Sequence, residues 1–178
     1  LTTRLATLGY ALPGAVLAVG FFVPVAWLDN ALIATIKNLT GIETQVFLQG
    51  TLLIMLTAYL VRFLAVGFNS VDAAMQRITP HIDDAARSLG LTPRSMLARV
   101  HLPMLRSGLA TAMALVFVDV MKEIPITLMT RPFGWDTLAV RIYELTSEGQ
   151  WEQAALPALA LVLAGMLPII LLVRNTEK

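Results

Sequence analysis

Four long stretches of the chain are almost free of charged residues, and more polar segments separate them. Each is long enough to cross the hydrocarbon core of a membrane as an α-helix, which takes about 20 residues. The predicted spans are Leu5–Leu28, Val46–Phe68, Leu109–Thr130 and Ala154–Val173. A soluble chain this short could not enclose four such helices on all sides. The pattern therefore predicts an all-α membrane protein with about four transmembrane helices.

The middle segment, residues 69–108, is too long for a hairpin turn and too regular for a disordered loop. Its first part, Val71–Leu89, has a helical pattern that is interrupted near Pro80. Gly90 follows at the place where a helix end favours a left-handed residue. We therefore expect a helix that ends in a tight glycine turn.

A second short helix is predicted directly after this turn, with Thr92 as its N-cap and Pro93 in its first turn. Its apolar face comprises Met96, Leu97 and Val100, and its charged face comprises Arg94 and Arg99. Leu102-Pro103 is expected to end the helix before the chain re-enters the membrane. Such a projection suits insertion of a few apolar anchors into a groove on a partner.

The second outer loop, residues 131–152, has apolar residues at helical spacing, namely Leu138, Ile142 and Leu145. Aromatic residues that are typical of membrane interfaces surround them, namely Trp135, Tyr143 and Trp151. This pattern predicts a short helix on the membrane surface. The first outer loop, residues 29–45, is short and mixed, and neither loop has the character of a globular domain.

The distribution of Lys and Arg predicts the orientation, because cytoplasmic loops are enriched in these residues. One side would carry Arg4, Arg77, Arg87, Arg94, Arg99, Arg106, Arg174 and Lys178, and the other side Lys37, Arg131 and Arg141. Both termini and the middle loop are therefore predicted to be cytoplasmic, with the chain multi-pass in the inner (plasma) membrane.

Composition excludes several other classes. The chain is 57% hydrophobic and 14% charged, against about 25% charged residues in soluble domains. Its net charge of +1 provides no basic surface for nucleic acid. The absence of cysteine excludes disulfides, thiolate metal sites and a cysteine nucleophile. His81 and His101 lie in the middle loop without further visible ligands, so no metal site is predicted.

Part of the middle loop resembles the cytoplasmic signature of binding-protein-dependent ABC transporter permeases. The signature reads Glu-Ala-Ala, three residues, Gly, nine residues, Ile, any residue, Leu-Pro. The matching residues are Asp84, Ala85, Ala86, Gly90, Val100, Leu102 and Pro103. The spacing matches throughout, with Asp84 in place of Glu and Val100 in place of Ile. The resemblance implies that these residues couple the permease to an ATPase.

A second resemblance, to the C-terminal half of ferric-iron uptake permeases, extends from about Val46 to Arg174. Three segments carry it, namely Lys122–Pro125, Arg131–Gly134 and Asp136–Arg141. Two homologous halves are often fused in that group, so residues 1–178 are expected to form one permease domain, one half of a longer permease. Permeases for thiamine, polyamines and phosphonates share the general pattern and remain alternatives to ferric iron.

Three charged residues lie within or beside the third predicted span, namely Asp119, Lys122 and Glu123. Charges within a membrane usually face a cavity, a protein interior or each other. Asp119 and Glu123 are four residues apart and would share a helix face. The three residues either line the translocation path or form an internally paired cluster.

The resemblance implies three protein partners: ATP-binding cassette ATPase subunits, a second permease half or subunit, and a periplasmic solute-binding protein. ATP would be used by the ATPase partner, and no cofactor is expected on this chain. The sequence has no G-x-x-x-x-G-K-[ST] run, so the chain is not the ATPase. It also has no H-E-x-x-H or G-x-S-x-G motif of an intramembrane enzyme. A secondary transporter or channel that works without ATP is the other alternative.

Overall fold

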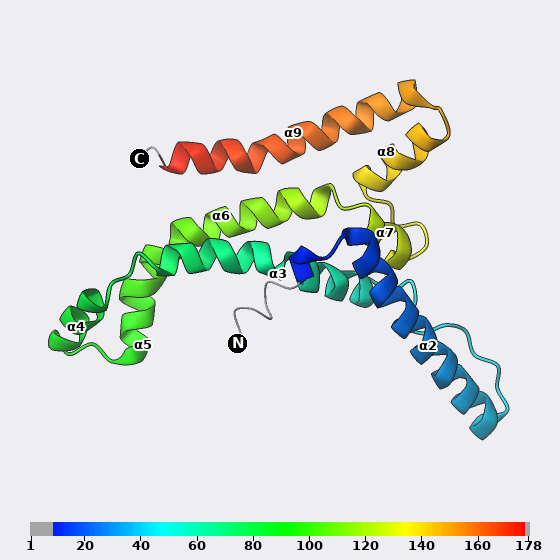
Figure 1. Cartoon of the computed structure of the whole chain (residues 1–178), viewed down its shortest axis with the longest axis horizontal. Helices are drawn as coiled ribbons and strands as arrows, with labels where there is room; N and C mark the ends of the chain where they lie inside the picture. The colour runs from blue at the N-terminus through cyan, green and yellow to red at the C-terminus, as the bar shows by residue number, and fades with distance from the viewer. Residues whose placement is uncertain (1–8, 177–178) are drawn as a thin grey trace.

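The computed structural model describes residues 9–176, and these contain α-helices and connecting segments without a β-strand (Figure 1). The helices are α2 (Gly14–Thr40), α3 (Leu52–Met75), α4 (Pro80–Ser88), α5 (Pro93–Met96), the π-helical turn η1 (Leu97–His101), α6 (Leu102–Met121), α7 (Pro125–Thr130), α8 (Leu138–Ser147) and α9 (Trp151–Thr176). Four helices are long and apolar enough to cross a membrane: α2, α3, the continuous helix Pro93–Met121, and α9. The predicted all-α architecture with four spans is confirmed.

Helices α3, α6 and α9 form a layer, in which α6 contacts both of its neighbours (Figure 1). Helices α4 and α5 project from one end of this layer, and α7 and α8 lie at the other end. Helix α2 diverges from the layer and packs mainly against α7. The C-terminal end of α9 lies at the same end of the layer as α4 and α5.

The largest core cluster lies where α2, α3 and α7 meet. Its buried members are Leu17, Ala18, Met55, Ala58, Tyr59, Phe63 and Ile126. The hydroxyl groups of Tyr59 and Thr127 are hydrogen-bonded to each other beside this cluster, so α3 and α7 share a polar contact as well as an apolar one. This junction joins the diverging helix α2 to the rest of the fold.

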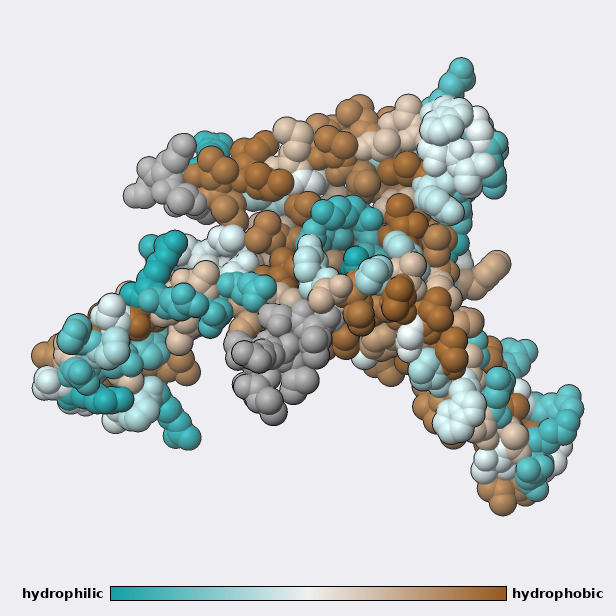
Figure 2. Space-filling view, in the orientation of Figure 1, coloured by the Kyte–Doolittle hydropathy of each residue, from teal (hydrophilic) through white to brown (hydrophobic). Residues whose placement is uncertain are grey.

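Most of the apolar surface of the long helices is not buried within the chain. An apolar stretch of 18 residues in α9 contains no buried residue, and Figure 2 shows a nearly continuous hydrophobic surface along this helix. The projecting α4–α5 end is much more polar in the same view. An apolar surface this extensive requires cover by lipid or by other protein chains.

The first predicted span, Leu5–Leu28, was wrong at its C-terminal end, because α2 continues to Thr40. Residues 5–8 of that prediction lie outside the described residues. The charge of Asp29 suggested a helix end, but its buried carboxylate accepts hydrogen bonds from the backbone N–H groups of residues 47–49. With its charge satisfied in this way, Asp29 is compatible with a continuing helix.

The second predicted span, Val46–Phe68, is displaced from α3 by several residues at both ends. Thr51 sets the start of α3, because its hydroxyl accepts a hydrogen bond from the N–H of Ile54. At the other end the helix continues to Met75, so the middle segment is shorter than the predicted residues 69–108. Only residues 76–101 separate α3 from α6.

The third predicted span, Leu109–Thr130, was wrong at both ends. The helix is continuous from Pro93 to Met121, and a separate short helix, α7, begins at Pro125. Proline has no N–H with which to continue the preceding helix, which explains the break. The prediction that Leu102-Pro103 ends the earlier helix was also wrong, because this pair lies in the first turn of α6.

Pro103 is tolerated there because the hydrogen-bond register changes immediately before it. In the π-helical turn, the N–H of Leu102 bonds to the carbonyl of Leu97, and a proline beside such a change removes a donor where the regular pattern is already interrupted.

The last predicted span, Ala154–Val173, agrees well with α9. The predicted short helix in residues 131–152 is α8, but its buried face was partly wrong. Ala139, Val140 and Leu145 are buried, whereas Leu138 is exposed and Ile142 is half-buried. Helix α8 uses this face to pack against α9. Its position on a membrane surface stays a prediction.

Candidate functional site

Helix α4 begins the projecting segment, and it carries the first part of the signature. Pro80 occupies its first turn after an extended Thr79. Ala86 is buried, whereas Ala85 is exposed. Asp84 is also exposed and lies 3.6 Å from the guanidinium of Arg87 on the same helix. The two adjacent alanines thus have different environments: one packs inside the projection and the other lies on its surface.

Gly90 ends α4 in the left-handed conformation that the sequence predicted, with φ of 76°. The N–H of Leu91 bonds to the carbonyl of Ala86 at 3.1 Å, and the N–H of Gly90 bonds to the carbonyl of Arg87 at 2.9 Å. This is the hydrogen-bond pattern of a Schellman helix end. A Cβ atom at Gly90 would meet nothing within 4 Å. The backbone conformation, rather than lack of space, therefore requires glycine here.

The next helix begins as predicted, because Thr92 accepts a hydrogen bond from the N–H of Ser95. Met96 is buried, but Leu97 on the following turn is 57% exposed. Leu89, directly before the glycine turn, is 82% exposed. The projection therefore buries Met96 as well as Ala86, and it leaves the leucines Leu89 and Leu97 uncovered.

The second part of the signature lies on the continuous helix that leads into α6. Val100 is half-buried, whereas Leu102 and Pro103 are exposed. One contact ties this part to α4: the Nε2 atom of His101 lies 2.7 Å from Oδ1 of Asp83. The fold thus links the two halves of the signature into one projecting element.

The Asp83–His101 contact was not predicted from the sequence, from which only the lack of further metal ligands around the two histidines was inferred. Asp83 directly precedes the signature residue Asp84, and His101 directly precedes Leu102. Asp83 and His101 each adjoin one part of the same signature, and this was the only indication in the sequence that the two residues could meet. His81 is exposed. Residues 9–176 contain no group of three or more metal-ligating side chains that could hold a metal ion.

The three charged residues near the third span do not form one cluster. Asp119 pairs with Lys122 at 2.8 Å, and this hydrogen bond raises the pKa of Lys122. Glu123 lies beyond the end of α6, so the predicted helix face shared with Asp119 does not exist. A role of these three residues in lining a translocation path stays a prediction.

Glu123 instead joins α3 to the start of α7. Its Oε2 atom lies 3.1 Å from Nε of Arg62, although this nitrogen does not have the geometry of a hydrogen bond. Its other oxygen accepts the N–H of Ile126 at 3.1 Å. The side chains of Arg62 and Glu123 are 19% and 6% exposed. Arg62 and Glu123 carry opposite charges in two predicted spans, which favours their pairing. Their positions in the sequence alone did not show that the two side chains meet.

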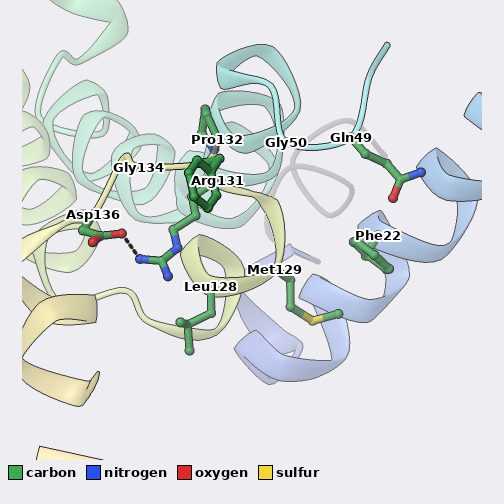
Figure 3. A pocket seen from close by; sticks show the side chains of 10 residues that line it. Phe22, Gln49, Gly50, Leu128, Met129, Arg131, Pro132, Gly134 and Asp136 are labelled. Carbon is green, nitrogen blue, oxygen red and sulfur yellow. Dashed lines mark hydrogen bonds and ion pairs between the residues drawn. The ribbon is translucent and has the colours of Figure 1, made fainter. Parts of the chain in front are cut away.

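A pocket of about 540 Å³ lies at the end of the layer opposite the projection (Figure 3). Phe22 of α2, Gln49, Leu128 and Met129 of α7, and Arg131 contribute to its wall. Burial works against the charge of Arg131, but hydrogen bonds to Glu144 and Asp136 leave its pKa raised. Figure 3 shows the ion pair between Arg131 and Asp136 within the wall. These contacts close the base of the loop at residues 131–136.

This loop exposes its apolar tip. Phe133 is fully exposed, and Gly134 adopts a left-handed conformation with φ of 77°. The N–H of Trp135 bonds to the carbonyl of Pro132 at 3.1 Å, which makes the turn tight. The Arg131–Gly134 segment was recognised in the sequence by resemblance, but its ion pairs were not.

Known proteins that are similar to most of this chain include two transport permeases. One is a Salmonella typhimurium protein provisionally named as the 2-aminoethylphosphonate transport system permease protein PhnV, which is 37% identical over 131 residues. The other is the Fe(3+)-transport system permease protein FbpB 2 of Haemophilus influenzae, which is 31% identical over 131 residues. Each match covers 74% of this chain.

The matches cover 49% of PhnV and 26% of FbpB 2, so the chain spans half or less of the length of these relatives. Residues 1–177 match the family described as the binding-protein-dependent transport system inner membrane component. The four apolar helices and the match along nearly the whole sequence agree, and the chain belongs to this family of ABC-type transport permeases.

Proposed function

We propose that this chain is the membrane-spanning permease subunit of an ATP-driven importer, and that α4, α5 and η1 dock on a separate ATPase. The observation that carries the docking is the exposure of Leu89 and Leu97 on an otherwise polar projection. Burying an exposed leucine contributes about 1.5–3 kcal/mol, enough to anchor a helix in a groove. Asp84, which is exposed beside them, is available to a basic residue on the partner.

The signature residues have separate roles in this proposal. Ala85 allows close approach, while Ala86 and Gly90 fix the shape of the projection. Val100, Leu102 and Pro103 connect it to α6, which would carry the movement of the ATPase into the membrane. ATP binds to the partner, and this chain contributes no catalytic residue. With the projection in the cytoplasm, the loop at residues 131–136 faces the periplasm and a solute-binding protein.

The permease works with a second permease half or subunit in this proposal. Much of the apolar surface of α6 and α9 is not buried within the chain, and a second subunit would cover part of it. For the solute, ferric iron and an organophosphonate are both supported, since relatives named for each are similar to this chain. Asp119, Lys122 and Glu123 are weaker candidates for the pathway, because their charges are largely paired within the chain.

The docking is tested by measuring the affinity of the full-length permease in lipid nanodiscs for its purified ATPase. Leu89→Asp should weaken binding by about tenfold to a hundredfold, because an apolar anchor is replaced by a charge. Leu89→Met keeps the apolar contact and should bind as the wild type does. Since Leu89 is exposed, neither change should alter folding. Equal affinity of the wild type and Leu89→Asp would contradict docking at this surface.

A further inference from the structure

A second hollow in the molecule has a different character from the pocket of Figure 3. It is a groove of about 470 Å³ between α3 and α6, close to the projecting segment. Its lining residues are Asn69, Ser70, Ala73, Ala74, Arg77, Ser107, Gly108 and Thr111. At its floor the helices touch, because a Cβ atom on Gly108 would collide with the side chain of Ala74. A groove of this size suits a small organic solute.

Most polar residues of the groove lie on candidate membrane-spanning helices, and Arg77 lies just beyond the end of α3. Asn69 belongs to α3 and Ser107 to α6, and both are exposed in the isolated chain. Exposing an amide to lipid is costly, so polar side chains at such positions face a water-filled cavity or another protein chain. We therefore expect the groove to face water or another protein chain rather than lipid.

Three of its polar side chains are free to bind a ligand. Ser70 and Thr111 donate to carbonyl groups of their own helices. The side chains of Asn69, Arg77 and Ser107, in contrast, make no hydrogen bond or ion pair within residues 9–176. An amide, a hydroxyl and a guanidinium all offer hydrogen-bond donors. The groove presents these donors together.

The charge of the groove selects the class of solute. Arg77 is the charged residue in its lining, and no Asp or Glu contributes to it. A guanidinium binds phosphate-like groups by charge-assisted hydrogen bonds, whereas a hard metal cation requires oxygen ligands such as carboxylates. Neither the charge nor the ligand set of the groove suits a ferric ion.

We infer that this groove is the cytoplasmic part of the solute pathway and that it binds an anionic solute of the phosphonate class through Arg77, Asn69 and Ser107. This inference rests on the proposed permease function and deepens it, because it selects between two solute classes. Arg77 lies between the end of α3 and the start of α4. A movement of the projection would therefore change the mouth of the groove directly.

The test uses the complete transporter, with its ATPase and binding protein, in cells that lack the natural genes. Uptake of radiolabelled 2-aminoethylphosphonate and of radiolabelled ferric iron is measured for each permease variant. Arg77→Gln should reduce phosphonate uptake by about tenfold or more, as expected for loss of a hydrogen bond between charged groups. Arg77→Lys keeps the charge and should retain most of the uptake.

Arg106→Gln is the matched control. Arg106 is exposed at the same end of α6 but does not line the groove, so its loss should leave uptake nearly unchanged. Size-exclusion chromatography of the purified transporter should show intact assembly for every variant, which separates solute binding from subunit packing.

The inference is overturned if the wild type takes up ferric iron but no phosphonate. It is also overturned if Arg77→Gln has no effect, has the same effect as Arg106→Gln, or prevents assembly. The proposed function fails in a different way. Uptake that continues with an ATPase unable to hydrolyse ATP would contradict an ATP-driven importer, whatever the variants of Arg77 do.

Discussion

The two ends of the helical layer are held together by different kinds of contact. The end formed by α7 and the neighbouring loops contains buried or half-buried charged groups with partners inside the chain, including Asp29, the Arg62–Glu123 pair and Arg131. The projecting end has the Asp83–His101 contact and two helix caps, and it leaves Leu89 and Leu97 uncovered. One end is stabilised by contacts within the chain, whereas the other leaves two apolar side chains exposed.

This difference suits a membrane subunit that transmits movement. The Arg62–Glu123 pair fixes α3 against the start of α7, because breaking it would leave an unpaired charge in a medium of low dielectric constant. The hydrogen bonds that Asp29 accepts tie α2 to residues 47–49. The projection can change its contacts at a lower energetic cost, since one glycine turn joins α4 to α5 and many of its side chains are exposed. Three substitutions test this difference between the two ends.

The largest effect is expected from Glu123→Ala. This change leaves Arg62 buried without its counter-charge and removes the acceptor for the N–H of Ile126. The free energy of unfolding should fall by about 3–5 kcal/mol, measured by denaturation of the full-length permease in detergent micelles. The double variant Arg62→Met/Glu123→Leu removes both charges and should recover most of the loss. A loss below about 1 kcal/mol for Glu123→Ala would show that the pair does not hold this end together.

A smaller and more local effect is expected from Gly90→Val. A β-branched residue in the left-handed conformation costs about 1–2 kcal/mol. Amide hydrogen exchange should become faster in residues 80–101, with little change in α7. Gly90→Asn is the matched control, because asparagine tolerates this conformation better. Equal exchange in both variants would show that the backbone conformation of Gly90 does not limit the projection.

The smallest effect is expected from Glu43→Gln. Glu43 pairs with Lys37 at 2.7 Å, but both side chains are largely exposed, and solvent screens such a pair. The free energy of unfolding should remain within about 0.5 kcal/mol of the wild-type value in the same denaturation experiment. A loss as large as that of Glu123→Ala would mean that charge pairing stabilises the fold irrespective of burial.

Local signals in the sequence predicted the projecting end well. Gly90 and the Thr92-Pro93 pair mark helix ends through rules that depend only on neighbouring residues, and the structure confirms both. The four apolar stretches also predicted four long helices, because length and hydropathy are local properties. The predicted helix end at Leu102-Pro103 was wrong because the local sequence does not distinguish a proline that ends a helix from one that follows a π-helical turn.

Contacts between distant residues could not be predicted in this way. Asp29 appeared to be a loop residue because its partners, the N–H groups of residues 47–49, belong to a later segment. Glu123 appeared to share a face with Asp119 because the break before Pro125 was not recognised. The groove with Asn69, Arg77 and Ser107 could not be predicted either, because it forms only where α3 and α6, which are distant in sequence, lie against each other.

The central claim is that the projecting end contacts an ATPase and the opposite end does not. The chain has no cysteine, so a single introduced thiol can be cross-linked without background from this sequence. The measurement compares Leu89→Cys with Phe133→Cys in the assembled transporter, after each thiol is labelled with a maleimide–benzophenone and irradiated. The photoreactive group inserts into C–H bonds of a neighbouring chain, so the ATPase needs no thiol of its own. If the projecting end docks on the ATPase, Leu89→Cys should be cross-linked to the ATPase and Phe133→Cys should not. Cross-linking of the ATPase through Phe133→Cys, or failure through Leu89→Cys in an assembled and active complex, would contradict it.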